Sequence, residues 1–131
     1  MTELTLGLKG RAEKVVDQTN TAKEMGSGSL DVFATPALVA MMEEAAVKAL
    51  VLEAGQSSVG VSLDIKHTAA TPLGMKVWAN AELIEIDRRR LVFKVEAFDE
   101  KEQIGSGKHE RFLIDSEKFM SKTLSKTLEQ E

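Results

Sequence analysis

The chain has 131 residues, of which 43% are hydrophobic and 29% charged, and this is the composition of an ordered globular domain with one hydrophobic core. Its formal net charge of −4, from 17 basic and 21 acidic residues, does not favour general attraction to nucleic acid or to anionic membranes. The absence of cysteine excludes disulfides, a thiol nucleophile and thiolate metal sites. We therefore expect a single domain spanning residues 1–131.

Two parts of the sequence bear on targeting to membranes. Residues 1–10 mix Glu3 and Lys9 with short apolar residues and contain no continuous hydrophobic stretch, so they do not predict a signal peptide. Residues 37–52 are strongly apolar but include charged side chains and are too short to span a bilayer. We expect a cytoplasmic protein that binds neither a membrane nor nucleic acid.

The first part of the chain predicts a strand region, a loop and then one long helix. Residues 7–21 indicate a weak strand region, and the glycine and serine content of residues 26–30 indicates a flexible loop. Thr35 supplies an N-cap hydroxyl and Pro36 occupies the first helical position, while a glycine follows the last predicted turn. The helix is therefore predicted from near Thr35 to near Ala54.

The second half of the chain changes to an apolar period of two residues, which predicts half-buried strands. Short turns separate these strands, so neighbouring strands are expected to run antiparallel. A terminal amphipathic helix is predicted at residues 116–128. The strands are predicted at residues 59–65, 75–83, 91–97 and 104–114, and Gly105 and Gly107 indicate a bulge in the last of them.

The long helix is apolar on nearly every side. Its apolar residues include Val39, Met42, Ala46, Val47 and Leu50. A helix of this kind is normally enclosed by other elements. One helix followed by consecutive hairpins cannot form a doubly wound parallel sheet. We therefore predict an α+β fold in which an antiparallel sheet wraps around one long central helix.

Glu43 is an acid within the apolar part of this helix. Its neighbours about one turn away include Val39 and Val47, whereas the adjacent Glu44 can pair with Lys48 four residues later. A buried carboxylate without a partner is costly, and such groups are often functional. Glu43 therefore either performs chemistry, or lies at a dimer seam or meets a structural donor from elsewhere.

Thr35 and His67 are further candidates for chemistry. A histidine at a strand end beside a turn is well placed for acid–base work, although it can equally bond to the backbone. Capping alone explains Thr35, but its hydroxyl could also face a substrate at the positive end of the helix, where an oxyanion is favoured. The second histidine, His109, indicates a structural or partly solvated position.

Arg88, Arg89 and Arg90 form a basic run in a predicted turn. Such a run is usually solvated, but it can also bind phosphate. The sequence contains no glycine-rich phosphate loop followed by Lys-Ser/Thr, no Gly-x-Ser-x-Gly nucleophile elbow and no histidine pair at metal-ligand spacing. A zinc-dependent hydrolase is therefore not expected.

Three segments of the sequence stand out together, and they are Val32-Phe-Ala-Thr-Pro-Ala-Leu-Val-Ala-Met-Met-Glu43, His67-Thr-Ala-Ala-Thr-Pro72 and Gly105-Ser-Gly-Lys-His-Glu-Arg111. In combination they resemble hotdog thioesterases related to fluoroacetyl-CoA thioesterase. The resemblance covers most of the chain, from about residue 15 to residue 122. Its most specific features are the second segment and the spacing between Thr35 and Glu43. The resemblance implies a hotdog fold.

The same resemblance implies an activity and an assembly. It implies hydrolysis of an acyl-CoA thioester by a homodimer with two active sites at the subunit interface. Thr35, Glu43 and His67 match the catalytic positions, and Gly60 matches a backbone donor near the thioester carbonyl. Glu43 would act as general base or as nucleophile. No metal is implied, and the only coenzyme is the coenzyme A of the substrate.

The resemblance departs at residues 25–31, which contain no aromatic residue where the fluoroacetyl-specific enzyme carries phenylalanines. A short-chain acyl-CoA in general is therefore a better expectation than fluoroacetyl-CoA alone. The arginines at 88–90 become candidates for binding the coenzyme A phosphates. The alternatives are a non-catalytic acyl-CoA binding or sensing module and an enoyl-CoA hydratase on the same fold, whose expected Asp/His motif is not found.

Overall fold

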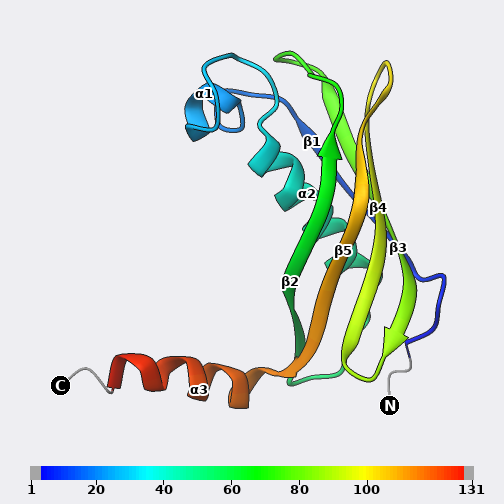
Figure 1. Cartoon of the computed structure of the whole chain (residues 1–131), viewed down its shortest axis with the longest axis vertical. Coiled ribbons are helices and arrows are strands. Elements are labelled where there is room, and N and C mark those ends of the chain that lie inside the picture. Colours follow the sequence, from blue (N-terminus) through cyan, green and yellow to red (C-terminus); the bar gives the residue numbers. More distant parts are fainter. Residues whose placement is uncertain (1–3, 129–131) are drawn as a thin grey trace.

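The structure, a computed structural model, describes residues 4–128 of the chain. The elements are β1 (Lys9–Val15), α1 (Ala22–Met25), α2 (Thr35–Ala49), β2 (Gln56–His67), β3 (Lys76–Asp87), β4 (Arg90–Asp99), β5 (Gln103–Asp115) and α3 (Ser116–Leu128). The strands form one antiparallel sheet in the order β1-β3-β4-β5-β2. This sheet curls around α2 (Figure 1), which is the predicted hotdog arrangement.

The inner faces of β3 and β4 supply much of the core. The alternation predicted for both strands is confirmed, because their inward-facing side chains are buried. These side chains belong to Val77, Ala79, Ala81 and Leu83 in β3 and to Leu91, Phe93, Val95 and Ala97 in β4. β1 approaches α2 closely at Gly10, where a Cβ atom would lie 2.1 Å from the carbonyl oxygen of Ala45. A glycine on the strand and an alanine on the helix therefore let the sheet close on the helix.

The long helix is shorter than predicted. α2 ends at Ala49, and Leu50 is already in an extended conformation, with φ −101° and ψ 132°. Val51 is 72% exposed. Good helix formers predicted a continuation to near Ala54, but the chain past Ala49 leaves the core, and packing decides where a helix ends more strongly than propensity does.

One side of α2 is not covered by the sheet of its own chain. The buried residues of this helix are Leu38, Met41, Met42, Ala45, Ala46 and Ala49. In contrast, Val47 is 48% exposed and the Glu43 side chain is 40% exposed. The sheet of one chain therefore curls around α2 as predicted, but it leaves this side of the helix open. The uncovered side presents apolar atoms together with a carboxylate.

β2 is an edge strand that carries a bulge. Within residues 4–128 it pairs only with β5, and its register shifts between Gly60 and Ser62. Val61 lies at this shift and is 52% exposed, so the predicted alternation is interrupted there. A second shift follows Ala97 of β4, opposite Gly105, close to the bulge predicted in β5.

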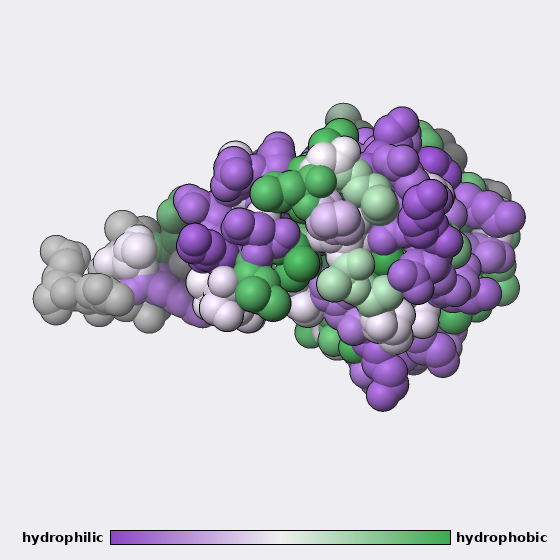
Figure 2. Space-filling model, turned by 90° about the horizontal axis from the view of Figure 1, so that it is seen from above, coloured by the Kyte–Doolittle hydropathy of each residue, from purple (hydrophilic) through white to green (hydrophobic). Residues whose placement is uncertain are grey.

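α3 continues directly from β5 and projects away from the body (Figure 1). From above, it forms a protrusion on which hydrophilic and hydrophobic residues are interspersed (Figure 2). Its exposed apolar side chains include Phe119, Met120 and Leu124, as expected of an amphipathic helix. Among residues 4–128, no helix is long and apolar enough to cross a membrane.

Candidate functional site

Thr35 and His67 meet where α2 begins and β2 ends. The hydroxyl oxygen of Thr35 lies 2.7 Å from Nδ1 of His67. Ala34 is the N-cap residue of α2 and makes no side-chain capping bond, so the predicted N-cap role of Thr35 is wrong. The Thr35 hydroxyl does not cap the helix, because it contacts instead a ring nitrogen of His67 at the end of β2.

This contact is compatible with a neutral His67 ring. A threonine hydroxyl that donates to Nδ1 suits a neutral imidazole with its proton on Nε2. Burial lowers the pKa of His67, and the backbone of Ala69 acts in the opposite direction. Nε2 is buried and has no hydrogen-bond partner within residues 4–128. Nε2 is therefore free to form a hydrogen bond with a bound molecule.

The Thr35–His67 pair lines a pocket of about 270 Å³. The other lining residues are mostly small, and they are Ala22, Ser27, Val32, Phe33, Thr68, Ala69 and Ala70. Phe33 is buried and is an aromatic wall residue that lies just outside the loop at 25–31. A pocket of this size and composition can hold a small, largely apolar group beside a threonine hydroxyl and an imidazole.

Glu43 does not join this pair within one chain. It lies eight residues after Thr35 on α2, which corresponds to about 12 Å along the helix axis. Within the described residues, no hydrogen bond connects Glu43 to Thr35 or His67. Its carboxylate oxygen Oε2 instead lies 3.5 Å from the Arg111 guanidinium. The structure therefore brings together two of the three predicted catalytic residues and places the third two helical turns away.

Gly60 lies directly against the Glu43 carboxylate. A Cβ atom at this position would be 2.6 Å from Oε2 of Glu43, closer than any ordinary contact. Glycine is therefore required for the carboxylate to rest on β2, next to the bulge that follows Gly60. The structure thus pairs two predicted site residues, Gly60 and Glu43, although the role of Gly60 as a backbone donor stays a prediction.

Arg111 and His109 are buried neighbours of Glu43 that the sequence did not single out as site residues. The Arg111 side chain is 7% exposed, and its Nε and second terminal nitrogen bind the hydroxyl and carbonyl oxygens of Ser58 at 2.8 and 2.9 Å. Burial lowers the pKa of Arg111, and the carboxylate of Glu43 opposes that shift. His109 was predicted to be structural or partly solvated, and its 1% exposure agrees with the structural alternative.

A pattern in the sequence could have revealed this cluster. Gly105, Gly107, His109 and Arg111 occupy alternate positions of β5 and therefore share one face. β4, which pairs with β5, and β3 beyond it place apolar side chains on the corresponding face. A strand that presents polar groups toward a core predicts a buried polar network, which must be hydrogen-bonded.

The arginine run forms the turn between β3 and β4, and Arg88 adopts a positive φ of 58° there. Arg90 forms ion pairs with Glu85 and Glu110, so its guanidinium is already engaged. Arg88 and Arg89 have no ion pair among the described residues, and both line an open pocket of about 500 Å³. They remain the better candidates for phosphate binding.

This turn lies far from His67 of the same chain. Arg90 pairs with Phe112 of β5, whereas His67 pairs with Gly105 at the other end of that strand. These two pairing positions are seven residues apart along β5, which corresponds to roughly 20 Å. A single substrate molecule would have to span that distance to contact both groups of one chain.

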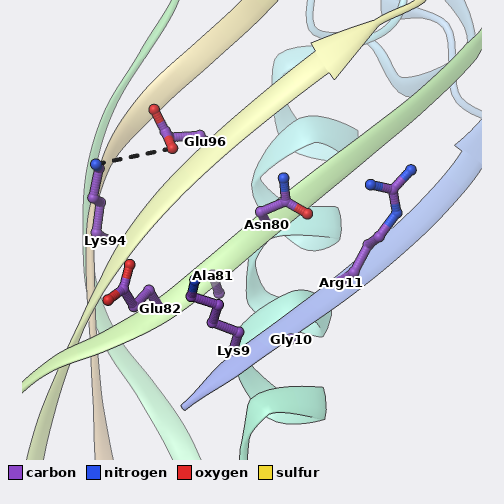
Figure 3. A pocket seen from close by; sticks show the side chains of 8 residues that line it. All are labelled: Lys9, Gly10, Arg11, Asn80, Ala81, Glu82, Lys94 and Glu96. Atoms are coloured by element: carbon purple, nitrogen blue, oxygen red, sulfur yellow. Dashed lines mark ion pairs between the residues drawn. The ribbon is translucent and has the colours of Figure 1, made fainter. Parts of the chain in front are cut away.

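A separate hollow of about 470 Å³ lies on the outer face of β1, β3 and β4 (Figure 3). Charged side chains surround it, including Lys9, Glu82 and the Lys94–Glu96 ion pair. Arg11 covers the nearby Trp78 ring at 5.1 Å. None of the predicted site residues lines this hollow, so the chemistry predicted from the sequence does not belong to it.

The family model described as fluoroacetyl-CoA-specific thioesterase matches residues 16–117. A fluoroacetyl-CoA thioesterase from Streptantibioticus cattleyicolor is 46% identical over 99 residues, which cover 74% of this chain and 71% of the relative. A solved variant of the fluoroacetyl-CoA thioesterase FlK in complex with acetyl-CoA is 38% identical, with a TM-score of 0.87 and coverage of 95% of this chain and 99% of that one. A thioesterase superfamily member from Thermus thermophilus is 28% identical, with a TM-score of 0.88 over 100% of both chains.

Proposed function

The chain belongs to the fluoroacetyl-CoA-specific thioesterase family, and we propose that this acyl-CoA thioesterase hydrolyses short-chain substrates with Thr35, Glu43 and His67 as its reacting groups. The observation that carries the proposal is the 2.7 Å contact between Thr35 and His67 at the wall of a small pocket. The pocket size supports a small acyl group. The proposed products are the free acid and coenzyme A.

The proposed chemistry begins at the Glu43 carboxylate. It either takes a proton from water while the water oxygen bonds to the thioester carbon, or bonds to that carbon itself to give an anhydride that water then cleaves. The backbone N–H of Gly60 would stabilise the developing oxyanion. Collapse of the tetrahedral intermediate breaks the carbon–sulfur bond, and Nε2–H of His67 would donate a hydrogen bond to the departing thiolate, which in the first route takes the proton that Glu43 received from water. No metal and no further cofactor enters this scheme.

Isotopic oxygen distinguishes the two routes. Repeated turnover in ¹⁸O-water labels only the product acid if water attacks the thioester directly. If Glu43 forms an anhydride that water cleaves on the glutamyl side, mass spectrometry of the peptide containing Glu43 shows incorporated ¹⁸O.

The 12 Å offset between Thr35 and Glu43 supports a second copy of the chain as part of the site. We propose a homodimer in which the β2 edge strands pair antiparallel about a two-fold axis. That pairing would cover the open side of α2. It would also bring Glu43 of one protomer toward the Thr35–His67 pair of its partner.

The same pairing bears on the coenzyme A phosphates. Antiparallel β2 strands would place the beginning of one β2 beside the end of the other, so the turn containing Arg88 and Arg89 would approach the pocket of the partner subunit. We propose that these two arginines meet the phosphates of coenzyme A. Because coenzyme A thioesters are intracellular metabolites, we also propose a cytoplasmic location.

A panel of acyl-CoA thioesters with thiol release as the readout tests the proposal. Acetyl-, propionyl-, butyryl- and longer-chain substrates should show a kcat/KM that falls as the chain outgrows the pocket. The rival function is a non-catalytic acyl-CoA binding or sensing module. Tight binding of these substrates without thiol release at any chain length would favour that module and exclude the proposed activity.

A further inference from the structure

The inner face of β5 carries a chain of polar contacts that ends at Glu43. One terminal nitrogen of Arg111 lies 3.5 Å from Oε2 of Glu43 and 3.2 Å from Nε2 of His109. The other ring nitrogen of His109, Nδ1, lies 2.8 Å from the carbonyl oxygen of Ser62. The register of β2 shifts between Gly60 and Ser62. The Ser62 carbonyl therefore lies at the same bulge as Gly60, against which the Glu43 carboxylate rests.

The donors and acceptors of this chain fix the proton on His109. A guanidinium can only donate, so Nε2 of His109 must accept. A carbonyl oxygen can only accept, so Nδ1 must carry the proton. The neutral ring protonated on Nδ1 is therefore the only form that satisfies both contacts. Burial and the charge of Arg111 both lower the pKa of His109, while the Ser62 carbonyl and the carboxylates of Glu43 and Glu110 act in the opposite direction.

His109 adds a third contact to the Arg111 guanidinium. Two of its nitrogens bind Ser58 on one side of the guanidinium. The nitrogen that faces Glu43 also lies 3.2 Å from Nε2 of His109, so one of its two hydrogens can meet the ring while the other points toward the carboxylate. The His109 ring is itself held by burial and by the Phe93 ring, whose centroid is 6.3 Å away.

We infer that His109, in its neutral Nδ1-protonated form, is a positioning residue that orients the Arg111 guanidinium and through it the Glu43 carboxylate. This inference rests on the proposed function, because the carboxylate must be the reacting group for its orientation to matter. His109 does not touch the substrate in this arrangement. It would affect turnover only through the side chains of Arg111 and Glu43.

The tautomer is testable without any activity measurement. The chain contains only two histidines, so ¹⁵N–¹H correlation spectra of the imidazole rings can be assigned with a His67→Gln variant. At pH 7 we expect a protonated Nδ1 and an unprotonated Nε2 for His109. A proton on Nε2, or a doubly protonated ring at that pH, would overturn the inference.

Two variants separate positioning from a merely structural role. His109→Gln can place its amide oxygen near the position of Nε2 and still accept from Arg111. His109→Asn can donate to the Ser62 carbonyl but is too short to reach Arg111. We expect kcat to fall about tenfold or more in His109→Asn with KM within about twofold, and to stay within about threefold of wild type in His109→Gln.

The outcomes of this comparison are distinct. Equal losses of kcat in both variants, in proportion to their losses of thermal stability, would show that His109 serves only packing. A wild-type protein that releases no thiol from any acyl-CoA would defeat the proposed function, and the inference with it. The wrong tautomer in an active wild-type enzyme would overturn the inference alone.

Discussion

Replacing Gly60 with alanine tests whether the Glu43 carboxylate must lie against β2. The added Cβ atom would come 2.6 Å from Oε2 of Glu43, whereas ordinary contacts begin at 3.4 Å. The carboxylate must therefore retreat by about 0.8 Å. The next nearest atoms, on His109 and Arg111, are 3.2 and 3.3 Å away and need to give by a few tenths of an ångström at most.

A displacement of this size is costly for turnover if Glu43 is the reacting group, as proposed. Because a misplacement of about 1 Å can cost up to about a hundredfold in rate, we expect kcat of Gly60→Ala to fall between about tenfold and a hundredfold. The fold should survive, since the atom that is displaced is the end of a flexible side chain. Gly60 is also outside the left-handed backbone region, where alanine would be strained. The midpoint of thermal unfolding should stay the same or rise slightly.

The assay is thiol release by wild type, Gly60→Ala, Glu43→Gln and the double variant, with thermal unfolding of each. If the alanine acts through the carboxylate, it should cost little once Glu43 has been replaced. Wild-type kcat in Gly60→Ala would refute the reasoning. An equal loss in both backgrounds would refute it as well, because the methyl group would then act on something other than Glu43.

Three further predictions follow from the site and its titratable groups. Thr35→Val should lower kcat about tenfold by removing the bond to Nδ1, whereas Thr35→Ser should keep most of it; equal turnover in both would contradict a role for that bond. Joint replacement of Arg88 and Arg89 by glutamine should raise KM for acyl-CoA, most clearly at low salt, and leave kcat unchanged; an unchanged KM would move the phosphate site elsewhere. Burial lowers the pKa of His67 and His109 from 6.5, so the folded state binds fewer protons than the unfolded chain just below that pH. The free energy of unfolding should therefore be constant above about pH 7 and fall as the pH is lowered below about 6.5 in urea titrations, less so when both histidines are glutamine; a flat profile in wild type would contradict this.

The strands were predictable from the sequence because their inner faces repeat every two residues. β3 and β4 are buried on one face by apolar side chains at alternate positions, and this pattern does not depend on distant residues. The bulge in β2 was not predicted. Its cause lies partly in a neighbouring element, since Gly60 accommodates the Glu43 carboxylate of α2.

The features of the site that the sequence did not predict are contacts between segments that lie far apart in the chain. Spacing on the helix correctly marked Glu43 as an acid without a helical partner, but Arg111 comes from a strand 68 residues later. Local capping rules assigned the Thr35 hydroxyl to the helix end, whereas His67 binds it from the end of β2. Periodicity in the sequence shows which face of an element a residue occupies. The topology of the sheet determines which other strand supplies the residue that it contacts.

Steady-state kinetics of Glu43→Gln against Glu44→Gln test the central claim most directly. The two acids are adjacent, but Glu44 forms ion pairs with Lys14 and Lys48, whereas Glu43 faces Gly60 and Arg111. Glu43→Gln should lower kcat by at least about a hundredfold and leave acyl-CoA binding largely intact. Glu44→Gln should keep wild-type turnover and lose only a few tenths of a kcal/mol of stability. Wild-type kcat in Glu43→Gln, with thiol release confirmed in the parent enzyme, would contradict the proposed site.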